Sequence, residues 1–209
     1  MSKIALLHPS RSYTYSQVRE SDLHDAIVAH DIYDLPQLDL GQFDGLIVSS
    51  ACDQEFLLVH KEKIRAFLDA GKVLSFSGHL FRPWLPGAGM FQPKTITSYK
   101  DYVVRLVADH PVFEGVRAED LTFRKGVAGF FARGHHEPPA GAEIIAMLPG
   151  DEPIVYVDRV STRGVILVHA GNDLLASVDR DSTAGRIAGQ LLRWMLAEAA
   201  GLARTEVPV

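Results

Sequence analysis

The stretch Gly71-Lys72-Val73-Leu74-Ser75-Phe76-Ser77-Gly78-His79 decides the fold of this chain. Its apolar, β-prone centre predicts a buried strand over 72–77, and the Ser-Gly-His that follows predicts a turn displaying polar side chains. Gly71 predicts the end of a preceding helix, because glycine readily adopts the left-handed backbone found just after many helices. In an open α/β sheet, ligands bind beyond the carboxyl ends of such strands. The central question for function is therefore whether Ser77 is a nucleophile or a turn residue.

Apolar runs on both sides of this stretch predict a parallel sheet. Buried parallel strands are continuous in their apolar residues, and that pattern recurs over 3–8, 44–50 and 164–169. Asp53 predicts the N-cap of the helix that ends at Gly71. Residues 16–30 predict another helix, and 31–35 a short strand. A C-terminal helix is predicted from Ser182 or Thr183 to about Gly201, with an apolar stripe of Ile187, Leu191, Leu192, Met195 and Leu196.

The second half of the chain predicts antiparallel structure. Its β-prone runs are 95–107, 121–124, 127–133, 142–148 and 154–160. The prolines and aromatic residues of 81–93 predict an ordered loop, in which Phe81, Trp84 and Phe91 either wall a pocket or anchor a dimer partner. We therefore expect a single domain over 1–209 of the α/β class. Its predicted architecture is a flavodoxin-like three-layer sandwich with a mostly parallel sheet and an antiparallel β-rich portion from about 95 to 160.

Composition narrows the range of partners. Among 209 residues, 47% are hydrophobic and 22% charged, and the net charge of −5 comes from interspersed acids and bases. No basic face is predicted, so we expect no nucleic-acid partner. No apolar run reaches the roughly 20 residues of a membrane span, and the N-terminus lacks a signal peptide's layout, so we expect a cytoplasmic protein without membrane contact. The single Cys52 excludes an intramolecular disulfide and a cysteine-based zinc cluster.

Five short motifs carry a family resemblance. They are the segments 43–48, 67–72, 77–79, 110–116 and 164–169. In order and spacing they resemble the class I glutamine amidotransferase-like superfamily, and within it the ThuA-like and related branches that lack the nucleophilic Cys. Amidotransferases of this class carry a Cys on a sharp turn flanked by glycines, a His ending a later strand, and a Glu two residues beyond.

The resemblance places specific residues of this chain in those positions. Ser77 takes the position of the Cys, and Ser75 and His79 replace the flanking glycines. His169 takes the position of the family's His. The expected Glu position is Gly171, and the nearest acid is Asp173. These departures imply a protein that has lost glutamine hydrolysis.

Three hypotheses for function remain open. The first is a binding protein that holds a small polar ligand or a protein partner, without a cofactor, in a crevice at the strand ends. Besides Ser77, His169 and Asp173, that crevice would be lined by His8, Arg11, Ser50, Asp53, Gly78, His79 and Asn172. The second is a serine-dependent amide or ester hydrolase with Ser77 as nucleophile, His169 as base and Asp173 as orienting acid. The third is a homodimeric interaction module. Ser77 and Gly78 have a simpler interpretation too, namely that loops crowd together there.

Histidines and arginines of this sequence are candidate ligands for ions. His8, His79 and His169, with His135 and His136 nearby, offer ring nitrogens, but no metal-binding spacing occurs among them, so we predict no metal site. Guanidinium groups suit carboxylates and phosphates. Arg11, Arg82, Arg124 and Arg133 are the candidates for an anionic group, and Arg11 is best placed because it follows the first strand closely.

Overall fold

An eight-stranded sheet forms the centre of the molecule in a computed structural model that describes residues 3–9, 25, 27–177 and 181–205. Its strands lie in the order β2 (Ile27–Asp31), β1 (Ile4–His8), β3 (Gly45–Val48), β4 (Val73–Ser77), β12 (Val165–His169), β11 (Glu152–Asp158), β10 (Glu143–Leu148) and β6 (Arg105–Leu106). The first five run parallel to one another. Their order is that of a flavodoxin-like sheet, which confirms the predicted fold class.

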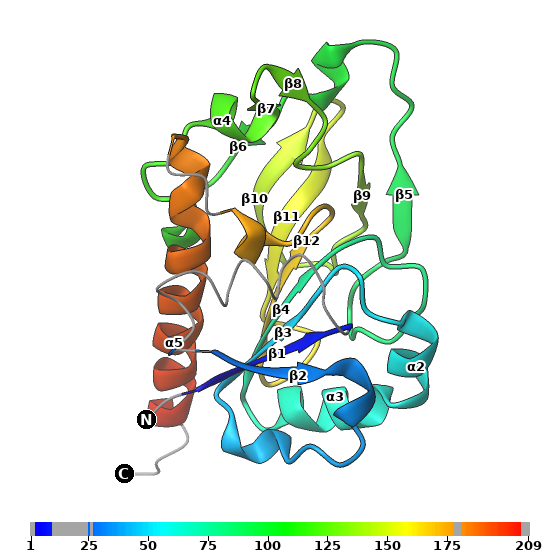
Figure 1. Ribbon diagram of the computed structural model, residues 1–209, viewed down its shortest axis with the longest axis vertical. Helices are drawn as coiled ribbons and strands as arrows, with labels where there is room; N and C mark the ends of the chain where they lie inside the picture. The colour runs from blue at the N-terminus through cyan, green and yellow to red at the C-terminus, as the bar shows by residue number, and fades with distance from the viewer. Residues whose placement is uncertain (1–2, 10–24, 26, 178–180, 206–209) are drawn as a thin grey trace.

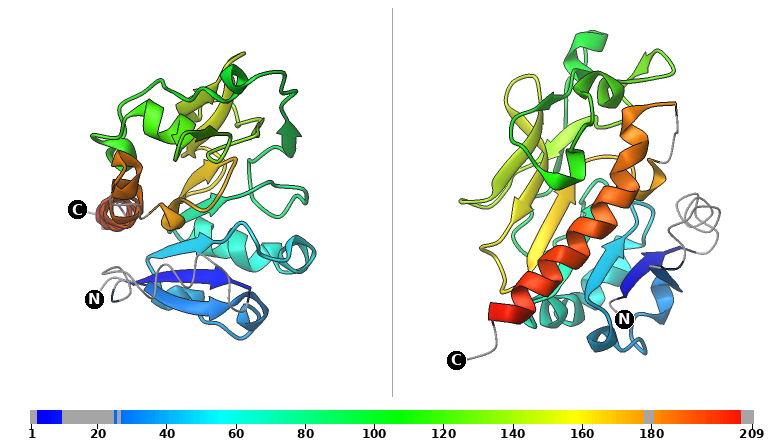
Figure 2. Two further views of the ribbon diagram at one scale, coloured as in Figure 1. Left: turned by 45° about the horizontal axis from the view of Figure 1, so that its top comes forward. Right: turned by 90° about the vertical axis from the view of Figure 1, so that its left-hand side faces the viewer.

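Helices cover both faces of the parallel half (Figure 1). α2 (Gln54–Val59) and α3 (Lys61–Asp69) lie on one face, where α3 buries Ile64, Phe67 and Leu68. α5 (Ile187–Thr205), which follows the 3₁₀ turn η7 (Thr183–Arg186), crosses the other face diagonally (Figure 2). Alternate strand residues serve the two cores: Leu167 packs on the α5 side, whereas Ile166 and Val168 pack on the α2–α3 side. The sheet is thus the middle of three layers.

The antiparallel half extends the sheet beyond β12 (Figure 1, upper part). β11 pairs antiparallel with β12, β10 with β11, and β6 with β10. Two small sheets stand apart from it. β5 (Phe91–Pro93) pairs with β9 (Gly134–His136), and β7 (Phe123–Arg124) forms a hairpin with β8 (Val127–Ala128). The expectation of antiparallel β-structure in the second half is confirmed.

Several local predictions are wrong, and turn chemistry explains most of them. The sequence predicts a helix over 16–30, but residues 27–30 belong to strand β2. Residues 16–24 lie outside the described part of the chain. The strand predicted over 31–35 is the 3₁₀ turn η2 (Ile32–Asp34), because the Asp31 carboxylate accepts the amide of Tyr33 and caps a helical turn. Residues 95–107 form the 3₁₀ turn η4 (Tyr99–Tyr102), with Ser98 and Asp101 as its capping box, followed by the short β6. α4 (Ala118–Thr122) replaces the start of the strand predicted at 121–124.

The aromatic loop is ordered by burial rather than by a partner. The Trp84 ring is 1% exposed and packs edge-on against Phe76 at 5.1 Å, so Trp84 belongs to the core and is no dimer anchor. Phe91 stacks on His79. Phe81 is the exposed one of the three, and a homodimer stays a prediction.

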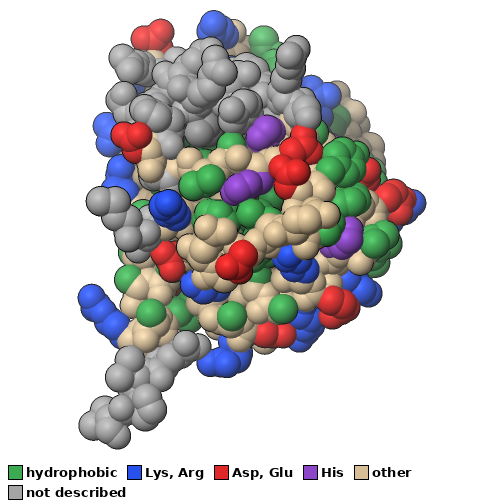
Figure 3. Space-filling view, turned by 60° about the horizontal axis from the view of Figure 1, so that its bottom comes forward, with side chains coloured by type: hydrophobic (Ala, Val, Ile, Leu, Met, Phe, Trp, Pro, Cys, Tyr) green, Lys and Arg blue, Asp and Glu red, His purple; other side chains and the backbone are tan. Residues whose placement is uncertain are grey.

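Surface composition matches the interspersed charges of the sequence. On the face shown in Figure 3, acidic and basic side chains alternate with apolar ones. Within the described residues, we find no helix with the length and apolarity to cross a bilayer.

Candidate functional site

The carboxyl ends of β3, β4 and β12 meet at one edge of the sheet, as parallel strands require. Ser77, the last residue of β4, lies directly beside His169, the last residue of β12, as its partner in the strand register. Asp173 reaches from the loop after β12 to the end of β3. Its two carboxylate oxygens accept hydrogen bonds from the Ser49 hydroxyl at 2.8 Å and from the Ser50 amide at 2.6 Å. The three strand ends are therefore tied together.

Ser77 does not have the geometry of an activated nucleophile. A nucleophile elbow holds its residue on a strained strand-to-helix turn, but among the described non-glycine residues only Lys125 and Asp151 have a positive φ. Irregular chain rather than a helix follows β4. The Ser77 hydroxyl is buried and accepts the Leu174 amide at 3.3 Å. The Gly78 amide, a candidate oxyanion-hole donor, instead donates to the His169 carbonyl at 2.9 Å.

Crowding accounts for the small residues at the end of β4. Gly78 has a φ of 141°, and a Cβ there would lie 3.0 Å from the Phe76 ring and 3.1 Å from Ser50 Cα. Such a backbone conformation and such close neighbours favour glycine. The simpler interpretation of Ser77 and Gly78 therefore fits this structure.

His169 is the unusual residue of the site. Its side chain is 1% exposed, its ring packs against the Phe131 ring at 4.4 Å, and neither ring nitrogen makes a well-formed hydrogen bond. Burial lowers the pKa of His169 to about 3; hydrogen-bonding contacts with the backbone of Asn172 and Phe131 oppose this shift, and the nearby His136 and His79 add to it. The imidazole is therefore neutral at pH 7. The predicted triad is not joined by hydrogen bonds, because Ser77 and Asp173 bond to other groups.

The loop after β12 is held against the segment that follows the β7–β8 hairpin. Gly171 forms a β-bridge with Ala132, and the side-chain amide of Asn172 donates to the Phe130 carbonyl at 2.8 Å. A Cβ on Gly171 would lie 1.7 Å from the Phe131 carbonyl oxygen, so only glycine permits this approach. These contacts place the Phe131 ring beside His169.

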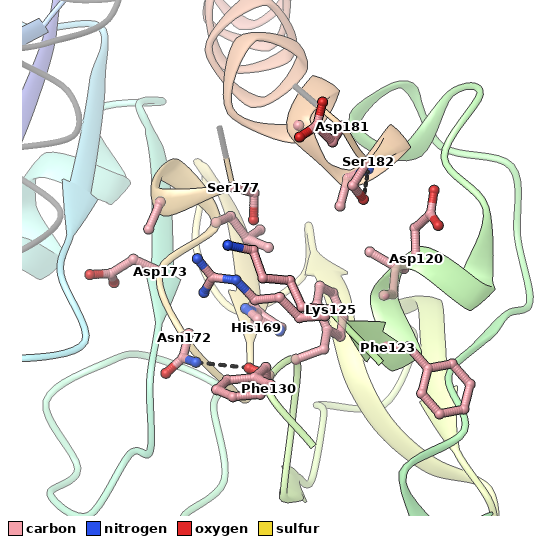
Figure 4. Close-up of a pocket in the computed structure, with 17 residues that line it drawn as sticks. Asp120, Phe123, Lys125, Phe130, His169, Asn172, Asp173, Ser177, Asp181 and Ser182 are labelled. Carbon is pink, nitrogen blue, oxygen red and sulfur yellow. Dashed lines mark hydrogen bonds between the residues drawn. The ribbon is translucent and has the colours of Figure 1, made fainter. Parts of the chain in front are cut away.

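A cavity of about 360 Å³, which we call the strand-end pocket, opens between β12, the β7–β8 hairpin and the start of α5 (Figure 4). Its walls are apolar at Leu121, Phe131 and Leu174. Polar and charged residues complete the lining: Asp120, Arg124, Lys125, His169, Asn172, Asp173, Ser177, Asp181 and Ser182. Figure 4 shows Asp181 and Ser182 on the α5 side and Lys125, Phe130 and Asn172 gathered around His169. The volume is within the range of small-molecule sites.

The predicted site residues divide into two groups. His169, Asn172 and Asp173 line the pocket. Ser77 lies outside its lining, as do His8, Ser50, Asp53, Gly78 and His79, and Arg11 falls outside the described residues. Asp53 caps α2 by accepting the amides of Glu55 and Phe56, and it also binds the Tyr33 hydroxyl. The His79 ring is stacked on Phe91 at 3.7 Å.

Sequence reasoning missed the hairpin as a wall of the site. Lys125 and Gly126 form its two-residue turn, with φ angles of 51° and 78°. Two positive φ values are typical of the tight turn that matches the twist of a hairpin. A Lys-Gly pair between two β-prone runs was the available signal. Arg124, one of the four arginines considered for an anionic group, lies in the same hairpin with its guanidinium 5.9 Å from the Phe130 ring centre.

Metal ligation was tested across the described residues. They contain no cluster of three or more His, Cys, Asp and Glu side chains suited to a metal ion. Cys52 is buried, and its thiol donates to the Leu7 carbonyl at 3.3 Å. Burial raises the pKa of that thiol, which opposes reactivity.

Comparisons with known proteins bear on the fold alone. The sequence matches no protein-family model and none of the curated proteins. Among solved structures, the chain is similar to a cytoplasmic protein from Salmonella typhimurium LT2 with a TM-score of 0.58 and 9% identity, over 94% of this chain and 99% of that one. It is also similar to a glutamine amidotransferase from Thermotoga maritima, with a TM-score of 0.53 and 12% identity, over 99% of this chain and 86% of that one. A third similar structure is PurLQS from Thermotoga maritima, with a TM-score of 0.52 and 10% identity, over 93% of this chain and 99% of that one. The fold is thus similar to that of a glutamine amidotransferase.

Proposed function

We propose that this chain, whose fold resembles glutamine amidotransferases, lacks glutaminase activity and binds a small polar ligand in the strand-end pocket. One observation carries the proposal: His169 lines the pocket, and both of its ring nitrogens are buried without a well-formed hydrogen bond. A buried polar group without a partner costs about 1–3 kcal/mol. A ligand that forms a hydrogen bond with the ring would recover that free energy, which would favour ligand binding at this site.

The end of β4 supports the loss of glutaminase activity. The position that carries Cys in class I amidotransferases is Ser77 here, and its hydroxyl is occupied by the Leu174 amide. The Gly78 amide is likewise engaged. A glutaminase needs a free nucleophile and a free oxyanion-hole donor. We expect no glutamine-dependent release of ammonia above the background of Ser77→Ala.

Binding is tested by a thermal-shift screen of metabolites, because a ligand of the native state raises the melting temperature by mass action. Ser177→Trp narrows the pocket, and Val160→Trp places the same side chain at an exposed position after β11. We expect a compound that stabilises the wild type and Val160→Trp but not Ser177→Trp. A compound that stabilises all three equally would place the ligand elsewhere and contradict the proposal.

A serine hydrolase is the second candidate, favoured by one observation. Ser77 and His169 are register partners on neighbouring parallel strands, so their side chains leave the sheet on the same face. A shift of either side chain on substrate binding could bring nucleophile and base together. Labelling by a fluorophosphonate probe that is lost in Ser77→Ala would support this activity, and a wild type that does not label would exclude it.

A further inference from the structure

We infer that the strand-end pocket binds an organic anion with a flat apolar body, oriented with its anionic group toward Arg124 and Lys125 and an uncharged hydroxyl or carbonyl against His169. The inference rests on the proposed function and names the class of ligand. It follows from three features of the pocket: two cations at the hairpin, an apolar aromatic wall and a neutral buried imidazole.

The two cations come from the hairpin. Arg124 and Lys125 both line the pocket and both are exposed, and neither forms an ion pair with a described residue. Five other described arginines are bound to acids, among them Arg159, which donates two hydrogen bonds to Glu198. Unpaired cations at the mouth of an apolar cavity attract an anionic group, and a guanidinium suits a carboxylate or a phosphate.

The acids of the lining are directed elsewhere. The Asp120 carboxylate accepts hydrogen bonds from the Thr183 amide and hydroxyl and from the Arg117 guanidinium. Asp173 is bound to Ser49 and Ser50. Asp181 lies on the α5 side, away from Lys125 (Figure 4). The hairpin side of the pocket is therefore its cationic side.

The apolar walls of the pocket determine which ligand body fits between the hairpin and His169. Phe130 and Phe131 line the pocket together with Leu121 and Leu174. Aromatic side chains pack well against flat rings, whose faces and edges are complementary to theirs. A planar apolar body therefore fits better than a flexible polar one.

The deep end is set by His169. Because burial keeps this imidazole neutral at pH 7, it offers one N–H donor and one lone pair and no charge. A second anionic group there would lie against an uncharged ring. A hydroxyl or a carbonyl would bond to the ring, which is why we assign the uncharged polar group to this end.

Three naphthalene probes test the inference by calorimetric titration at low salt. They are 6-hydroxy-2-naphthoate, its neutral amide, and 2-naphthoate, which lacks the hydroxyl. We expect the hydroxy acid to bind at least tenfold more tightly than either of the others. Arg124→Gln with Lys125→Gln should abolish the preference for acid over amide, while Lys61→Gln with Arg193→Gln, the same charge change at remote exposed positions, should keep it. His169→Leu should abolish the preference for the hydroxyl.

Each opposite result overturns the inference. An amide that binds as tightly as the acid, or a preference that survives in Arg124→Gln with Lys125→Gln, removes the assigned role of the cations. Failure of all three probes at 1 mM also rejects this ligand class. If the metabolite screen then finds a neutral ligand blocked by Ser177→Trp, the proposed function stands without this inference. If the screen finds none, both fail.

Discussion

Two neighbouring strands of this sheet end in opposite ways. At the end of β4, the Ser77 hydroxyl and the Gly78 amide both have hydrogen-bond partners within the chain, and neither residue lines the strand-end pocket. At the end of β12, His169 pairs with Ser77 in the strand register and is equally buried. Its two ring nitrogens have no well-formed hydrogen bond, and the residue lines a cavity. Buried polar groups are nearly always satisfied. The two strand ends therefore differ in whether their buried polar groups have hydrogen-bond partners within the described chain, and this difference is the basis of the proposed ligand site.

The largest effect is expected from Gly171→Ala, which breaks the β12 end. Its Cβ would lie 1.7 Å from the Phe131 carbonyl oxygen and 2.9 Å from His169 Nε2, so the backbone must move. We expect a loss of about 3 kcal/mol or more in the free energy of unfolding, measured by urea denaturation. Gly201→Ala is the control, because nothing lies within 4 Å of its Cβ. In a helix that change should stabilise by up to about 1 kcal/mol. Equal effects would show that the loop after β12 is not held closely.

Asp173→Ala removes the carboxylate that links the loop after β12 to the end of β3. The substitution leaves the buried Ser49 hydroxyl and the Ser50 amide without their carboxylate partner. We expect a loss of about 2–3 kcal/mol in urea denaturation, since hydrogen bonds to a charged group are the stronger ones. Asp69→Ala, which removes an exposed pair with Arg65 on α3, should cost under about 0.5 kcal/mol. A similar small cost for Asp173→Ala would mean that the strand ends are not tied together by this carboxylate.

His169→Leu tests the β12 end directly. Removing a buried ring that has no hydrogen-bond partner should raise the stability of the ligand-free protein by about 1 kcal/mol at pH 7. His136→Leu is the contrast, because the His136 ring accepts the Leu80 amide and its loss leaves that amide unpaired. We expect His136→Leu to be destabilised by about 1–2 kcal/mol. If both variants lose stability alike, His169 has a structural bond that its geometry does not show.

The pH dependence of the free energy of unfolding is a second test of His169. The pKa of His169 is lowered to about 3 in the folded chain, against 6.5 for an ordinary histidine. Between these values the unfolded chain binds the extra proton, so stability is present above pH 6.5 and falls as the pH is lowered. The contribution is about 1.4 kcal/mol per pH unit. Urea denaturation from pH 6 to pH 4 should therefore show a slope smaller by that amount in His169→Leu. An unchanged slope would contradict the neutral buried imidazole.

The smallest effect is expected at the hairpin, where Lys125 has a φ of 51°. Asparagine accepts this conformation more readily than lysine, and Asn-Gly is the favoured pair for such a turn. Lys125→Asn should stabilise by about 0.5 kcal/mol in urea denaturation while removing one cation from the pocket. Lys125→Val, with a β-branched side chain in the same turn, should destabilise by about 1–2 kcal/mol. Stabilisation by valine would show that the turn has another conformation in solution.

The fold could be predicted further than the site, for physical reasons. Continuous apolar runs identify the parallel strands because burial on both faces leaves no other composition, and the order of strands follows from helical crossovers. The position of the segment from His169 to Asp173 at the end of a buried strand could also be predicted. The packing of the β7–β8 hairpin beside the end of β12 could not be predicted, because both strands have only two residues and their placement depends on contacts distant in sequence. Asn172, for example, bonds to a carbonyl 42 residues earlier. Nor can any sequence pattern show whether a buried ring nitrogen has a partner.

The separation of the β7–β8 hairpin from the main sheet has a consequence for evolution. The hairpin pairs with itself and not with the eight strands, so insertions or deletions in it leave the central hydrogen-bond ladder intact. His169, by contrast, ends a strand of that ladder and cannot be displaced without disturbing it. Related chains could therefore acquire new ligands by exchanging the hairpin while keeping one fixed polar contact at the bottom of the pocket. Diversification of this site would proceed from its rim inward.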